Sequence, residues 1–118
     1  MPASSTALIR GTLDMLILRA LRWEPTHGAG VATWIRYVTA GAIDVDEGSL
    51  YPALHRLEER GLIASEWGRS EHNRRSRTYQ VTAEGRDFFW AEQERWERYK
   101  EVVDRVLRYG TAGGILGR

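Results

Sequence analysis

The chain contains no cysteine, only three prolines and no apolar run long enough to cross a membrane. The absence of cysteine excludes disulfide bonds, thiolate catalysis and zinc sites with cysteine ligands. A membrane-spanning helix needs about 20 consecutive apolar residues, so we expect no membrane partner. The first residues, MPASSTALIRG, lack a charged leader followed by an apolar stretch. We therefore expect the protein to stay in the cytoplasm.

Motifs for metal binding and catalysis are also missing. His27, His55 and His72 fall on different predicted elements, and no two of them have the spacing of metal ligands. The adjacent Glu58 and Glu59 point to different faces, and serine, histidine and aspartate form no nucleophile motif. The glycines form no phosphate-binding loop. We expect a protein that is not an enzyme and that needs no metal or other cofactor.

The residues that are present fit one small domain. A chain of 118 residues with 42% hydrophobic residues can build one modest core. The net charge of +1 carries little information, but four arginines gather between residues 69 and 77. Residues 84–108 are balanced, with seven acids and six bases. One basic cluster on a balanced chain fits nucleic-acid binding, and it fits a solvated loop equally well.

Hydrophobic periodicity predicts three helices in the first half of the chain, over residues 9–23, 28–39 and 46–60. Asp46 is the expected N-cap of the third helix. Pro52 fits that helix only in its first turn or with a local distortion, because proline offers no backbone N–H.

The third predicted helix has two contrasting faces. The apolar arc is expected to be buried and consists of Leu50, Ala53, Leu54 and Leu57. The opposite arc is expected to be exposed and consists of Gly48, Ser49, Tyr51, Pro52, His55, Arg56 and Glu59. This exposed arc is the candidate surface for contact with a partner.

A hairpin is predicted after the third helix. Residues 62–67 and 77–81 alternate between apolar and polar side chains, which is typical of strands. The nine polar residues between them, GRSEHNRRS, predict a long basic tip.

A final helix is predicted over residues 83–108, with Thr82 as its N-cap. Its length of about 38 Å is more than a domain of this size can cover. The stripe along it suits a second copy of the same helix, and the candidate dimer or effector residues are Phe89, Trp96, Tyr99 and Val103. Two Trp96 rings across a two-fold axis would sandwich a flat aromatic molecule, or they would simply seal the dimer.

Three helices, a hairpin and a further helix are the order of a winged helix-turn-helix, a mainly α fold with a small β-hairpin. A polar helix face fits the major groove of DNA, and a basic hairpin can contact phosphates. The candidate DNA-binding residues are Ser49, Tyr51, His55, Arg56, Arg69, Arg74, Arg75 and Arg77. The alternatives are that Ser49 caps the first turn, that Tyr51 packs beside Trp67 and that the remaining side chains are simply solvated.

Five segments occur in an order and at a spacing that resemble the PadR family of transcriptional regulators. They are LDMLILRAL, PTHG, GSLYPALHRLEERGLI, EWG and RRSRTYQVTAEG, and together they cover roughly residues 8–85. The long last helix has the form of the family's short subgroup. The resemblance implies a homodimeric repressor whose last helices pair, often with an effector pocket between them. Ala29 and Gly30 stand where the family usually has an aromatic residue.

We expect residues 1–82 to form a DNA-binding domain, residues 83–109 a dimerisation helix and residues 110–118 a disordered tail. The expected function is that of a sequence-specific, ligand-responsive homodimeric repressor. Its expected partners are double-stranded DNA carrying an inverted repeat, a second copy of the chain and a flat aromatic effector. Two alternatives stay open, namely a winged-helix module for protein association without a specific DNA target and a DNA binder that responds to no ligand.

Overall fold

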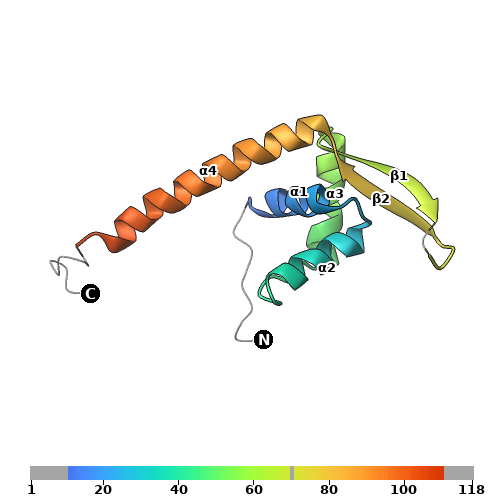
Figure 1. The fold of residues 1–118 in the computed structure, drawn as a ribbon, viewed down its shortest axis with the longest axis horizontal. Helices are drawn as coiled ribbons and strands as arrows, with labels where there is room; N and C mark the ends of the chain where they lie inside the picture. The colour runs from blue at the N-terminus through green and yellow to red at the C-terminus, as the bar shows by residue number, and fades with distance from the viewer. Residues whose placement is uncertain (1–10, 70, 111–118) are drawn as a thin grey trace.

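The computed structural model describes residues 11–69 and 71–110. The elements in chain order are α1 (Leu13–Trp23), α2 (Gly28–Val38), α3 (Glu47–Glu59), β1 (Ile63–Arg69), β2 (Arg75–Val81) and α4 (Ala83–Arg108). In Figure 1, α1, α2 and α3 lie together, the β1–β2 hairpin projects from one side and α4 extends away from the other. The winged-helix order and the mainly α fold predicted from the sequence are confirmed.

The core lies where the first three helices meet the base of the hairpin. The apolar arc of α3 is fully buried, as predicted, and every residue of its exposed arc is accessible to solvent. The arc packs with side chains from α1 and α2, namely Ile17, Leu18, Leu21, Val31 and Ile35. One face of α3 therefore belongs to the core, and the opposite face presents polar side chains to solvent.

Side-chain caps fix where α3 and α4 begin. The Asp46 carboxylate accepts a hydrogen bond from the Ser49 N–H at 2.8 Å, so Asp46 is the N-cap and Ser49 is not. The Thr82 hydroxyl accepts from the Gly85 N–H at 3.0 Å and donates to the Gly61 carbonyl at 2.7 Å. Thr82 therefore starts α4 and ties that start to the end of α3.

The start of the first helix was predicted wrongly, and the structure shows where Pro52 lies in α3. The first helix begins at Leu13 instead of Ile9, because Gly11 has a φ of +89°, outside the helical region. Pro52 lies beyond the first turn of α3, and the helix nevertheless continues through it to Glu59. Pro52 has no N–H to donate to the Gly48 carbonyl, and the helix tolerates this loss on its solvent-exposed side.

The hairpin strands are longer than predicted. They pair antiparallel from Ile63 with Val81 to Arg69 with Arg75, so the nine-residue loop of the prediction is wrong. The pattern of side chains misplaced the strand ends because backbone pairing near a tip needs no apolar side chain. β2 is also anchored on its other edge, where the Tyr79 N–H donates to the Thr26 carbonyl at 2.9 Å.

The helix α4 makes the molecule elongated, with extents of 63, 34 and 21 Å. Its first turns pack on the winged domain, and Phe89 is only 3% exposed there. Assigning Phe89 to a dimer or effector interface is therefore wrong, because its side chain belongs to the core of its own chain. The second half of α4 runs past the start of α1 (Figure 1), and most of its apolar side chains are exposed, with Val106 at 73%.

In the described ranges, no helix combines the length and the apolar character needed to cross a bilayer. The same part of the chain contains no group of three side chains able to hold a metal ion.

Candidate nucleic-acid interface

A concave surface joins the start of α2, the exposed arc of α3 and one face of the hairpin. We call this surface the basic groove; it has a volume of about 690 Å³ and is lined by His27, Gly28, Ala29, Tyr51, Trp67, Arg74, Arg75, Ser76, Arg77 and Tyr79. The lining contains three arginines and no carboxylate. Helix and hairpin therefore present one continuous surface that favours a polyanion.

Tyr51 stands where α3 meets the start of α2. A Cβ atom added at Gly28 would approach Tyr51 Cε1 to 2.8 Å and the hydroxyl oxygen to 3.1 Å. The ring therefore depends on the glycine for its place, although it remains 43% exposed. Tyr51 and Trp67 both line the basic groove, and contact between Tyr51 and DNA stays a prediction.

We predict that Gly28→Ala weakens DNA binding about fivefold, because the new methyl group displaces the Tyr51 ring from its place. A lost base contact costs about 1–3 kcal/mol. The substitution itself favours a helix, so the thermal midpoint should stay near that of the wild type. Fluorescence anisotropy with a labelled duplex measures the affinity. On a Tyr51→Ala background Gly28→Ala should have no further effect, and an equal loss there would show that Tyr51 is not the cause.

The other candidates on α3 differ in their surroundings. His55 is exposed, with Nε2 3.4 Å from a Glu59 carboxylate oxygen. The Arg56 guanidinium pairs with Asp14 of α1 at 2.7 Å, so Arg56 joins two helices of its own chain. Ser49 is exposed in the first turn of α3. DNA contacts by these residues stay a prediction, and a contact by Arg56 has to compete with Asp14.

The hairpin arginines surround one aromatic ring. Trp67 is 55% exposed, and its ring centroid lies 4.4 Å from the Arg75 guanidinium carbon and 5.3 Å from that of Arg77. Near the tip, Arg69 donates to the Asn73 carbonyl at 3.2 Å. The stacking of Trp67 with these arginines was not predicted from the sequence, because it follows from the strand register that pairs Trp67 with Arg77.

Tyr79 connects the groove to the core. Burial raises the pKa of its hydroxyl above the ordinary value, and the Arg77 guanidinium offsets part of this rise. The hydroxyl therefore stays protonated at neutral pH, and the ring contributes to the core as a neutral group.

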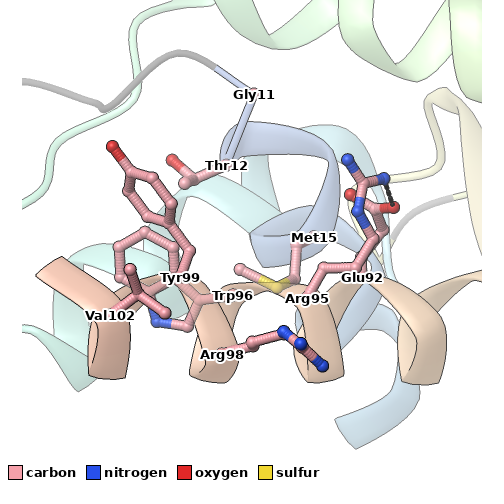
Figure 2. Close-up of a pocket in the computed structure, with 9 residues that line it drawn as sticks. All are labelled: Gly11, Thr12, Met15, Glu92, Arg95, Trp96, Arg98, Tyr99 and Val102. Atoms are coloured by element: carbon pink, nitrogen blue, oxygen red, sulfur yellow. Dashed lines mark hydrogen bonds and ion pairs between the residues drawn. The ribbon is translucent and has the colours of Figure 1, made fainter.

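A second hollow lies between the start of α1 and the middle of α4. This α1–α4 pocket has a volume of about 590 Å³ and is lined by Gly11, Thr12, Met15, Glu92, Arg95, Trp96, Arg98, Tyr99 and Val102. Figure 2 shows Met15 reaching from α1 toward α4, with Trp96 and Tyr99 on the α4 side. The centroids of these two aromatic rings are 6.5 Å apart. The pocket thus unites two of the four candidate dimer or effector residues, whereas Val103 lies outside its lining.

The fold and the basic groove together define a winged-helix DNA-binding protein. Residues 17–91 match the Transcriptional regulator PadR-like family, so the chain belongs to the PadR family of transcriptional regulators. It is therefore a DNA-binding regulator of transcription and not an enzyme.

Solved structures of bacterial regulators resemble most of this chain. A transcriptional regulator from Clostridium thermocellum is 34% identical, with a TM-score of 0.76 over 82% of this chain and 94% of its own. A PadR family regulator from Clostridium difficile is 30% identical, with a TM-score of 0.71 over 82% and 99%. A third, from Eggerthella lenta, is 32% identical, with a TM-score of 0.73 over 85% of each chain.

Proposed function

We propose that this regulator is a cytoplasmic homodimeric repressor that binds an inverted-repeat operator and is released by a small, flat aromatic molecule. The observation that carries the proposal is the basic groove beside the exposed arc of α3. A helix of this kind fits the major groove of DNA, while arginines on an adjoining hairpin reach the flanking phosphates. The candidate base contacts are Tyr51 and His55, and the candidate phosphate contacts are the hairpin arginines Arg69, Arg74 and Arg75.

The exposed half of α4 supports the dimer. The stripe that begins at the buried Phe89 continues along α4 with side chains that the rest of the chain covers only in part or not at all, namely Trp96, Tyr99, Val103 and Val106. A second copy of α4 would cover this stripe by the same pairing that buries apolar positions in a coiled coil. A two-fold dimer presents α3 twice in opposite senses, so its operator should be an inverted repeat.

The α1–α4 pocket supports the response to a small molecule. Trp96 and Tyr99 offer aromatic faces, and a second copy across the two-fold axis would double them. Such a site favours a flat aromatic ligand, because stacked rings attract one another beyond the area they bury. The repressor role is supported by membership of the PadR family and by simple exclusion, because a dimer on promoter DNA blocks access by polymerase.

The experiment that tests the proposal compares two labelled duplexes by fluorescence anisotropy, at two salt concentrations. One carries the promoter of the protein's own gene, and the other carries the same bases scrambled. We expect the promoter to bind at least about 1000-fold more tightly, as specific sites do. Equal affinities, both falling steeply with salt, would mean that binding is electrostatic only. The molecule would then fit a winged-helix module for protein association.

A further inference from the structure

We propose that Arg77 does not contact DNA but positions the hairpin, by bracing it on α3 through Glu58 and Ser65. The inference rests on the proposed DNA-binding function and assigns different tasks to arginines that look equivalent in the sequence. Arg77 and Arg75 lie two residues apart on β2 and contact the same tryptophan ring, but their polar surroundings differ.

One carboxylate joins α3 to both strands. The Ser65 hydroxyl of β1 donates to Glu58 Oε2 at 2.6 Å, and Arg77 Nη2 of β2 lies 3.4 Å from Glu58 Oε1. Arg77 Nε donates in turn to Ser65 Oγ at 2.8 Å, which closes the ring of three side chains. The Glu58 side chain is only 28% exposed, so water screens the ion pair less than at an open surface.

The cluster of Glu58, Ser65 and Arg77 acts as a brace, because it joins α3 to both strands of the hairpin. Glu58 lies near the end of α3, whereas Ser65 and Arg77 lie on neighbouring strands toward the middle of the hairpin. The hairpin is otherwise held closer to its base, where Ile63 and Tyr79 are buried and the Tyr79 N–H donates to the Thr26 carbonyl. Arg77, which pairs with Trp67, lies two residues nearer the tip than Tyr79. Without a contact farther out, the tip would swing relative to α3. The angle between hairpin and α3 sets whether both reach one duplex together.

The charge of Arg77 is already matched inside the protein. Its guanidinium faces the Glu58 carboxylate, so a phosphate would have to compete with an existing partner. Arg75 lies 4.4 Å from the centroid of Trp67, and across the described residues it has no carboxylate within ion-pair distance. Arg75 is therefore the arginine that stacking prepares for a phosphate, and Arg77 is the one that holds the strand in place.

The test uses the full chain, a labelled duplex of about 24 base pairs spanning two half-sites, and two variants of the brace. Arg77→Lys keeps the positive charge, but a lysine ammonium cannot reproduce the forked contact to Ser65 and Glu58. Glu58→Ala removes a negative charge close to the groove. If the three side chains form a brace, each variant weakens binding by roughly threefold to tenfold. The double variant should be no weaker than the weaker single variant, because both remove the same contact.

Two controls separate the brace from simple charge effects. Glu66→Gln removes a carboxylate from an exposed position of β1 and should cause no loss of affinity. Arg75→Ala should lower the slope of log affinity against log salt concentration by about one, as expected for one lost phosphate contact. Thermal unfolding checks that every variant is folded.

The opposite pattern would overturn the brace. If Arg77 contacts a phosphate, Arg77→Lys keeps most of the affinity and Glu58→Ala tightens binding, because the competing carboxylate is gone. Unchanged affinity in both variants would equally contradict a positioning role. Failure of the wild type to bind DNA would instead refute the proposed function, and the wild-type and Arg75→Ala titrations report on that separately.

Discussion

The double substitution Trp96→Glu and Val103→Glu should convert the protein to monomers in light scattering and weaken operator binding about 100-fold or more. Both side chains lie on the α4 stripe and are only half-buried in a single chain, and a second α4 would bury them fully. Two carboxylates per helix would then be desolvated facing their own copies, which a dimer cannot tolerate. A monomer presents one copy of α3 instead of two, so it loses the gain in affinity that comes from binding two half-sites at once.

The control for this experiment is Ala91→Glu, which adds a carboxylate to α4 at an exposed position away from the stripe. It should leave both the mass and the affinity unchanged. A Trp96→Glu, Val103→Glu variant that remains dimeric with full affinity would place the interface on another surface.

Gly85→Ala should lower the free energy of unfolding by about 2–3 kcal/mol, the cost of overpacking a close contact. A Cβ atom at Gly85 would collide with the Leu62 carbonyl oxygen and would approach Val81 Cγ2 to 2.7 Å. Neither the backbone of Leu62 nor the start of α4, which Thr82 holds, can move without breaking other contacts. We expect the thermal midpoint to fall by about 10 °C.

Circular dichroism during heating measures this loss. Gly68→Ala is the matched control, because a Cβ atom there meets nothing within 4 Å. An unchanged midpoint for Gly85→Ala would mean that α4 can shift away from the hairpin at little cost.

The same contacts explain the spacing of Tyr79, Thr82 and Gly85. Tyr79 places its ring in the core, Thr82 is the N-cap of α4, and Gly85 allows α4 to approach the backbone of Leu62 closely.

The helices were predictable from the sequence because their signals are local. Asp46 and Thr82 cap α3 and α4 as expected, and the two faces of α3 follow directly from a period of 3.6 residues. The start of α1 was misplaced because the apolar periodicity continues through Gly11, whereas the positive φ of Gly11 keeps that residue out of the helix. Phe89 was misassigned for a related reason. The stripe on α4 has one period throughout, and only the fold shows that α1 covers its first part.

The candidate interface was only partly predictable. The exposed arc of α3 and the basic character of the hairpin are properties of the sequence, and both are present in the structure. The partners of individual arginines could not be predicted from the sequence. Arg56 pairs with a residue 42 positions away and Arg77 with one on another element, so neither pairing follows from spacing along the chain. Register and packing decide which arginines pair with a carboxylate of their own chain.

Hydroxyl-radical footprinting of the promoter duplex tests the central claim most directly, namely that a two-fold dimer reads DNA with two copies of α3. We expect two protected regions of equal strength, related by a two-fold axis and about 34 Å apart, which is one turn of the duplex. The bases in the two regions should form an inverted repeat. Protection of a single half-site by each dimer, or uniform protection with no sequence preference, would contradict the claim.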